Sequence, residues 1–151
     1  MTTELIPKPT DFNTLVSEIE PMMIINIDSL DSETQRTVRI LSDLHKIYNR
    51  EASILKDLIN VQEKITHIRW KYYTGKMDGK YYKENPLHAA PTNKVDQEKY
   101  LKADDQVLNI NKLVSSQDRV VKYVEDCISQ AKRRSYEIRN VIDFRKLVSS
   151  Q

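Results

Sequence analysis

The chain has 151 residues, 30% of them charged and 39% apolar, with a formal net charge of +2. A single cysteine excludes an intrachain disulfide, and two glycines leave no room for a glycine-rich nucleotide-binding loop. No run approaches the ~20 apolar residues that span a bilayer, and the N-terminus lacks a secretory signal pattern. Few glycines with abundant Lys, Glu, Ile and Leu favour long helices. We therefore expect a mainly α-helical protein of the cytoplasm.

Residues 1–31 form an acidic N-terminal arm, in which one lysine stands against six acidic residues, a net charge of −5. Asp11 is placed to cap a short helix, whose apolar positions from Phe12 to Ile19 share one face and which Pro21 ends. The apolar run at 22–27 is then either a strand or a buried connector. We assign the rest, 32–151, to one helical domain.

A long helix is predicted from Ser32 to Thr74, because that stretch contains neither proline nor glycine. Ser32 and Gln35 form a capping-box pattern at its start, and Gly75 is a natural C-terminal stop. Its apolar residues repeat in steps of four and three, a heptad seam with one fault at Glu51. The seam is Ile40, Leu44, Ile47, (Glu51), Ile54, Leu58, Val61, Ile65, Ile68 and Tyr72.

The segment from Lys64 to Lys83 contains both glycines, five of the eleven aromatic residues, and six basic residues against one acid. Lysines contact phosphates and aromatic faces stack on unpaired bases, so this composition suits single-stranded nucleic acid. A second interpretation is a charged helix end followed by a surface turn whose tyrosines pack on a core. Residues 74–92 are predicted to form a turn or hairpin around Lys76–Gly79 and then an irregular segment.

A helical stretch resumes near Asp96, and a last long helix is predicted to begin between Asn109 and Ser116 and to end near Val148. Its seam has faults at Gln117 and Ser135. Two long heptad-patterned helices joined by an irregular segment predict an antiparallel pair that buries its remaining apolar stripes by self-association. The residues assigned to oligomerisation are Val121, Val124, Ile128, Ala131, Ile138 and Ile142.

No catalytic or metal site is predicted. The three histidines are scattered, and no His, Cys, Asp and Glu cluster has metal-ligand spacing. Asp104 and Asp105 are adjacent, and neighbouring helical residues do not face each other, so a helix cap or an intersubunit salt bridge is expected there. We expect no enzyme activity, no metal and no cofactor.

Three motifs stand out along the chain: HIRWKYYTG at 67–75 followed by Asp78-Gly79, LKADDQVLNI at 101–110, and alternating basic and apolar residues at 132–145. Together, and in this order, they resemble blocks of the UvsY recombination mediators of T-even-type bacteriophages. The resemblance covers most of the chain from about Asp11. One position departs from the family pattern, because the lysine that precedes the arginine is His67 here, and histidine is mostly neutral at pH 7.

This resemblance implies an ATP-independent, non-enzymatic protein that binds single-stranded DNA as a helical, ring-like homo-oligomer. It further implies that the protein helps to load the phage RecA-like recombinase UvsX onto strands covered by the phage single-strand-binding protein. Such a protein acts in DNA recombination, repair and replication, in the cytoplasm of the infected bacterial host.

The family's DNA-binding run maps onto residues 66–70, with Arg69 as the phosphate contact, lysines beside it, and aromatic residues as stacking surfaces. The full set assigned to DNA binding is Lys64, His67, Arg69, Trp70, Lys71, Tyr72, Tyr73, Lys76, Lys80, Tyr81 and Tyr82. The alternative function is a structural coiled-coil scaffold or assembly protein without nucleic-acid binding.

Overall fold

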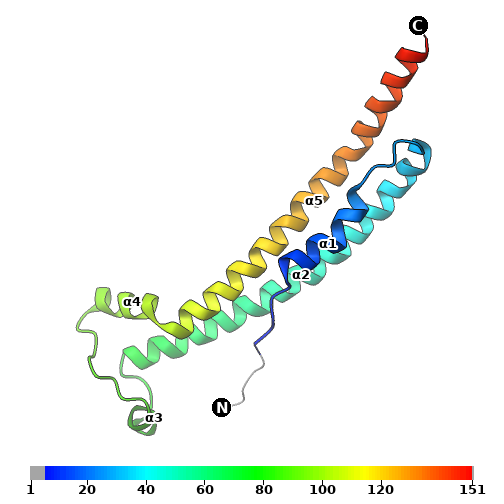
Figure 1. Ribbon diagram of the computed structural model, residues 1–151. Coiled ribbons are helices and arrows are strands. Elements are labelled where there is room, and N and C mark those ends of the chain that lie inside the picture. The colour runs from blue at the N-terminus through cyan, green and yellow to red at the C-terminus, as the bar shows by residue number, and fades with distance from the viewer. Residues whose placement is uncertain (1–5, 151) are drawn as a thin grey trace. The chain divides into compact units, whose positions relative to one another are not determined.

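The computed structural model describes residues 6–150, and every regular element in that range is an α-helix. The helices are α1 (Phe12–Met23), α2 (Leu30–Tyr73), α3 (Gly79–Glu84), α4 (Lys94–Ala103) and α5 (Asp105–Ser149) (Figure 1). The mainly α fold is confirmed. None of these helices combines the length and apolarity needed to cross a membrane. The chain forms two compact units: unit 1 holds residues 6–9 and Ile54–Ser116, and unit 2 holds Thr10–Ser53 and residues 117–150.

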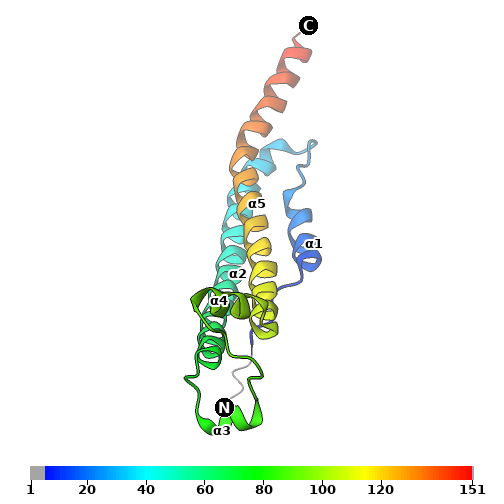
Figure 2. The same ribbon diagram turned by 90° about the vertical axis from the view of Figure 1, so that its left-hand side faces the viewer.

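Unit 2 is built from α1, the first half of α2 and the second half of α5, and residues of all three helices share one core (Figures 1 and 2). Leu15 and Ile19 of α1 are fully buried against the seams of α2 and α5. The other buried members of this core are Ile40, Leu44, Ile47, Val120, Val124, Cys127, Ile128 and Ala131. The apolar face expected of the short helix therefore completes the core of this unit.

The first helix begins as predicted and ends later than predicted. Asp11 caps it, because its carboxylate accepts a 2.8 Å hydrogen bond from the Thr14 amide. Pro21 does not end the helix, which continues to Met23. A proline removes one helical hydrogen bond, a small loss in a last turn whose carbonyls find other partners. Two arginine side chains supply these partners.

Arg36 donates to the carbonyls of Pro21 and Ile24, and Arg134 donates to those of Met23 and Ile24. Arg134 also forms an ion pair with Glu33 in which both side chains are almost fully buried. Because an unpaired buried charge costs several kcal/mol, these contacts fix the end of α1 against α2 and α5.

The start of α2 corrects the capping-box prediction. The helix begins at Leu30, and the Ser29 carbonyl accepts the first helical bond from the Glu33 amide. Ser32 lies inside the first turn, where its hydroxyl donates to the Ser29 carbonyl at 2.8 Å. The hydroxyl therefore bonds backward along the helix and does not cap it. Of the preceding apolar run, Met22 and Met23 form the end of α1, and residues 24–27 are a connector and not a strand. The connector is not buried as expected, because Ile24 and Ile27 are exposed.

The faults in the two heptad seams meet each other inside unit 2. Glu51 and Gln117 are both fully buried, and the Gln117 amide donates to the Glu51 carboxylate at 2.9 Å and to its backbone carbonyl at 3.0 Å. Arg50 pairs with the same carboxylate at 2.8 Å, and the Thr10 amide donates to the Gln117 side chain at 2.9 Å. A polar layer thus replaces one apolar layer between α2 and α5.

Unit 1 pairs the second half of α2 with the start of α5. Gln62 donates to Asn111 at 2.6 Å, and Arg69 contacts Asp104. The later residue of α2 thus contacts the earlier residue of the second segment, which means that the two segments run in opposite directions. In unit 2 the contacts show the same opposite direction: Glu33 of α2 meets Arg134 of α5, and the later Glu51 meets the earlier Gln117. The antiparallel arrangement predicted from the seams is therefore confirmed within each unit.

Gly75 ends α2 as predicted. Its φ of +73° belongs to the left-handed region that glycine adopts without strain. The Lys76 amide bonds the Lys71 carbonyl and the Gly75 amide bonds the Tyr72 carbonyl, the two bonds of a Schellman motif. A turn follows, and Asp78 then caps the short helix α3 through a 2.7 Å bond from the Tyr81 amide. Of the two predicted alternatives, turn and hairpin, the turn is present.

The last helix begins at Asp105, earlier than the predicted window of 109–116. Asp104 is the reason, because its Oδ1 accepts hydrogen bonds from the amides of Gln106 at 2.9 Å and Val107 at 3.2 Å. This is the geometry of an N-cap. The helix-cap role expected for this aspartate is thus confirmed, at a position nearer the N-terminus than the apolar pattern suggested.

Replacing Gln117 with Leu should destabilise the protein by about 2 kcal/mol, because Glu51 then loses its buried hydrogen-bond partner. The double variant Glu51→Leu/Gln117→Leu should recover most of this loss, since an apolar pair fits an apolar seam. Urea unfolding followed by circular dichroism measures both. A double variant less stable than the single one would show that the polar layer is itself stabilising.

Candidate nucleic-acid interface

The last turns of α2, the turn after it, α3 and the start of α5 form one connected site in unit 1. Arg69 is its centre. Its Nε donates to Oδ2 of Asp104 at 2.7 Å, and its guanidinium lies 4.3 Å from the Tyr72 ring centroid and 5.3 Å from that of Tyr73. The Arg69 side chain is 12% exposed and that of Asp104 is 4% exposed. Arg69 is therefore largely enclosed and already holds an ion-pair partner.

Asp104 accepts four hydrogen bonds, two at each carboxylate oxygen. Oδ1 caps α5, and Oδ2 accepts from Arg69 and, at 2.8 Å, from the Tyr73 hydroxyl. Burial alone would raise the pKa of Asp104, but the bonds from Tyr73, Arg69 and the Val107 amide outweigh burial and lower it. Burial likewise opposes the charge of Arg69, yet the Asp104 carboxylate that it bonds, with Tyr73 beside it, raises its pKa. Both groups are ionised at neutral pH.

The four tyrosines of the segment pack on one another. Tyr72 is buried, and its ring stacks on Tyr82 at 5.7 Å and meets Tyr73 and Tyr81 edge to face. The Tyr82 hydroxyl donates to the Tyr72 carbonyl at 2.7 Å, and the Tyr72 hydroxyl donates to the Pro86 carbonyl at 3.3 Å. The pairs from α2 and α3 thus form a single aromatic cluster that fixes the turn between these helices.

Trp70 lies beside this cluster with its own contacts. His67 stacks on its ring with centroids 5.8 Å apart, and the Lys76 ammonium lies 4.1 Å from its centroid. An open groove of about 390 Å³ adjoins the indole, lined by Gln62, Glu63, Thr66, His67, Trp70 and Leu101. Trp70 lies on the side of α2 opposite the heptad seam, where no core was expected. His67 and Lys76 cover its ring, so the side chain is half-buried.

The lysines surround this framework from outside. Lys64, Lys76 and Lys80 are exposed, and Lys71 is half-buried in the last turn of α2. The tyrosine cluster thus carries basic groups at its surface. Such a surface is suited to a polyanion, because lysines neutralise phosphates without reading the bases.

The structure brings all eleven residues assigned to DNA binding into unit 1 and places them unequally. Lys64, Lys76, Lys80 and His67 are exposed, whereas Arg69 and Tyr72 are engaged inside the site. The half-buried members are Trp70, Lys71, Tyr73, Tyr81 and Tyr82. Their contact with DNA stays a prediction. Asp104 joins the site as a residue to which the sequence assigned only a cap or an ion pair between subunits. Its pairing with Arg69 links residues 35 positions apart, which no local pattern indicates.

The residues assigned to oligomerisation lie in unit 2, and their role also stays a prediction. Val121, Val124, Ile128, Ala131 and Ile138 are buried within this chain, and Ile142 is half-buried. Nearby, large apolar side chains of α5 are exposed, namely Tyr136, Phe144, Leu147 and Val148. Within the described residues, no group of His, Cys, Asp and Glu side chains could hold a metal ion.

Two long antiparallel helices with polar layers between them, and a turn with exposed lysines around it, define an all-helical protein of the helical-pair type. Residues 18–151 match the model of the family described as "Recombination, repair and ssDNA binding protein UvsY". The chain belongs to the UvsY family. No curated protein matches the chain.

Two crystal structures of the recombination mediator protein UvsY of bacteriophage T4 have the same fold. In lattice type II the TM-score is 0.80 at 17% sequence identity, covering 93% of this chain and 98% of the other. In lattice type IV the TM-score is 0.76 at 15% identity, covering 91% and 98%.

Tyr82→Phe should loosen α3 without unfolding the helical pair. The hydroxyl bonds the Tyr72 carbonyl, so its loss should cost about 1 kcal/mol, felt at the turn. Hydrogen exchange of the amides at 77–84 should then be roughly fivefold faster, while amides in the core of unit 2 exchange as before. Tyr136→Phe is the matched control, because that hydroxyl sits on an exposed ring. Unchanged exchange at α3 would mean that ring packing alone holds it.

Proposed function

We propose that this protein is a recombination mediator that loads a phage RecA-like recombinase, UvsX, onto single strands covered by the phage single-strand-binding protein. Membership of the UvsY family is the observation that carries this proposal. The protein acts without a catalytic site or a cofactor, in the cytoplasm of the infected bacterial host. Its partners are single-stranded DNA, the recombinase, the single-strand-binding protein and further copies of itself.

The lysines around the tyrosine cluster support the DNA-binding part of the proposal. Lys64, Lys71, Lys76 and Lys80 contact phosphates, with Arg69 beside them. Because hydrogen bonds hold the backbone that carries them, binding to DNA has to order only the lysine side chains and not the chain itself. The half-buried rings of Trp70, Tyr73, Tyr81 and Tyr82, with the neighbouring His67, provide the aromatic surface for unpaired bases, and the buried Tyr72 supports it from within. Affinity should therefore vary little with base sequence.

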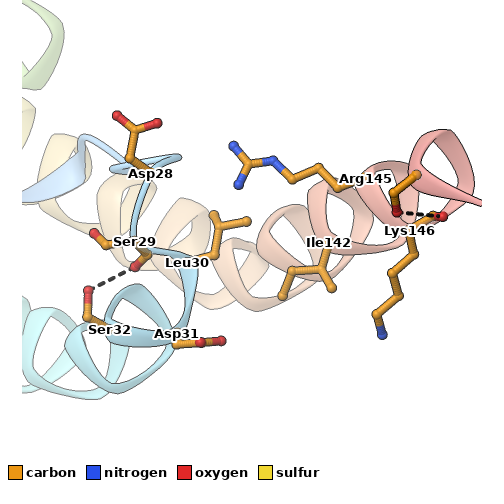
Figure 3. A pocket seen from close by; sticks show the side chains of 9 residues that line it. Asp28, Ser29, Leu30, Asp31, Ser32, Ile142, Arg145 and Lys146 are labelled. Atoms are coloured by element: carbon orange, nitrogen blue, oxygen red, sulfur yellow. Dashed lines mark hydrogen bonds between the residues drawn. The ribbon is translucent and has the colours of Figure 1, made fainter.

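Exposed apolar side chains on the last turns of α5 support self-association. Phe144 is 66% exposed and Leu147 63% exposed, which is unfavourable for an isolated chain in water. A groove of about 650 Å³ adjoins these turns, with Ile142, Arg145 and Lys146 on one side and Asp28 to Ser32 on the other (Figure 3). Assembly into a closed ring would bury this surface. Ile142 and the seam from Val121 to Ile138 would support it from inside the chain. A ring multiplies weak DNA contacts by avidity.

The alternative is a helical scaffold protein that binds no nucleic acid. The satisfied hydrogen bonds of the tyrosine cluster favour it, because rings that pack on one another need no base to bury them. The two functions differ in whether the lysines bind DNA.

Lys76→Ala/Lys80→Ala should weaken binding to a fluorescent single-stranded oligonucleotide in an anisotropy titration. The slope of log affinity against log salt should fall by roughly 0.7 for each phosphate that the variant no longer neutralises. Lys56→Ala/Lys112→Ala removes the same charge from exposed positions outside the segment, and should change both quantities little. If the parent protein does not bind the strand at low salt, the scaffold function is the correct one.

The same variants test the loading step. On a strand covered by single-strand-binding protein, the parent should shorten the lag before the recombinase assembles. The release of labelled single-strand-binding protein from the strand measures this lag. The variant at residues 76 and 80 should lose most of this effect, and the control variant should keep it. A parent protein that binds DNA but leaves the lag unchanged would contradict the mediator function alone.

Phe144→Asp/Leu147→Asp should reduce the mass measured by light scattering while helicity stays the same, because charges at an apolar interface oppose association. Val124→Asp should instead lower the stability of the chain itself by about 3 kcal/mol or more, since that side chain is fully buried inside unit 2.

Ser135→Asp/Asn140→Asp adds the same two charges to exposed polar positions of α5 and should leave the mass unchanged. An intact assembly in the variant at residues 144 and 147 would show that another surface joins the subunits.

A further inference from the structure

We propose that Asp104 is a positioning residue for DNA binding, which holds Nε of Arg69 so that the outer N–H groups of its guanidinium are presented to a phosphate. This inference rests on the proposed function, in which Arg69 contacts DNA. It assigns a positive role in binding a polyanion to an acidic residue, which charge alone would count as repulsive.

The geometry separates the guanidinium into a held part and a free part. Nε donates to Asp104 at 2.7 Å, and Nη1 lies at a long 3.5 Å from the Tyr81 hydroxyl. A guanidinium has more N–H donors than these two partners engage, and it binds phosphate through paired donors. The side chain keeps 12% of its surface in solvent, so part of it remains accessible.

The neighbours of the guanidinium fix the direction in which it faces. The rings of Tyr72 and Tyr73 lie against it, Tyr81 lies near Nη1, and Asp104 holds Nε. A free arginine samples many rotamers and loses up to about 2 kcal/mol of entropy when it is ordered. Here that ordering is completed in the folded protein, so a phosphate meets a preorganised donor.

Asp104 is itself held from three directions, which makes it a firm support. The amides at the start of α5 bond Oδ1, and the Tyr73 hydroxyl shares Oδ2 with Arg69. Its negative charge is directed to these partners inside the protein, because its side chain is only 4% exposed. Its repulsion of a phosphate is offset by the positive charge of Arg69, with which it is paired.

The two tasks of Asp104 can be separated by Asp104→Asn. Asparagine caps a helix as well as aspartate does, so the bonds to Gln106 and Val107 persist and α5 keeps its start. The amide carries no charge to pair with Arg69, and its NH2 group, if it faces Nε, offers a second donor where an acceptor is needed. The variant therefore releases Arg69 while it preserves the fold.

The experiment measures single-strand binding of the full chain by anisotropy, with two oligonucleotides of different base sequence and at several salt concentrations. Asp104→Asn should bind about tenfold more weakly, because a hydrogen bond to a charged group contributes about that much. The salt slope should fall by roughly 0.7, the value of one phosphate contact on a single strand. Asp105→Asn is the matched control: it removes the same charge at an exposed neighbour and should bind as the parent does or slightly more tightly.

A second measurement asks whether Asp104 acts through Arg69. At low salt, where the lysines alone keep binding measurable, Asp104→Asn should add no further weakening in an Arg69→Ala background. Equal weakening in both backgrounds would overturn the proposal, as would an Asp104→Asn variant that binds as tightly as Asp105→Asn. Failure of the parent to bind DNA would instead contradict the proposed function, and circular dichroism of each variant verifies that α5 is intact.

Discussion

A buried carboxylate, that of Asp104, is the constraint on which the arrangement of unit 1 depends. This carboxylate caps α5, forms an ion pair with Arg69 in the last turns of α2, and accepts a hydrogen bond from the Tyr73 hydroxyl. Because a carboxylate buried without partners costs several kcal/mol, these elements must come together for the charge to be tolerated. The same carboxylate holds Tyr73, one member of the tyrosine cluster.

Polar pairs also decide register within unit 2. A heptad seam repeats, so apolar contacts alone allow one helix to slip along the other by a whole repeat. Glu51 meets Gln117, and Glu33 meets Arg134, and each pair is buried. A slipped register would leave these groups without partners in an apolar seam, so the pairs select one alignment. The seam faults are therefore part of the specification of the fold.

The candidate interface has an aromatic interior and a basic exterior. Tyrosines are suited to the interior, because their rings bury large apolar areas while their hydroxyls find polar partners, as when Tyr82 donates to the Tyr72 carbonyl at the end of α2. Lysines are suited to the exterior, since their ammonium groups remain hydrated until a phosphate replaces the water. Arg69 lies between the two layers, with its Nε turned inward.

The sequence by itself determined the local structure: the heptad seams, the cap at Asp11, the stop at Gly75, the cap-forming character of Asp104 and the family resemblance. These depend on residues a few positions apart, whose spacing is visible in one dimension. The tertiary structure alone decided which polar groups meet, as in Arg69–Asp104 and Glu51–Gln117, and that the seam from Val121 to Ile138 is buried inside the chain. The tertiary structure also explains why α1 continues beyond Pro21, because the carbonyls at its end accept hydrogen bonds from Arg36 of α2 and Arg134 of α5. Such pairings join distant residues through the energy of burying charge, which depends on the complete fold and not on local spacing.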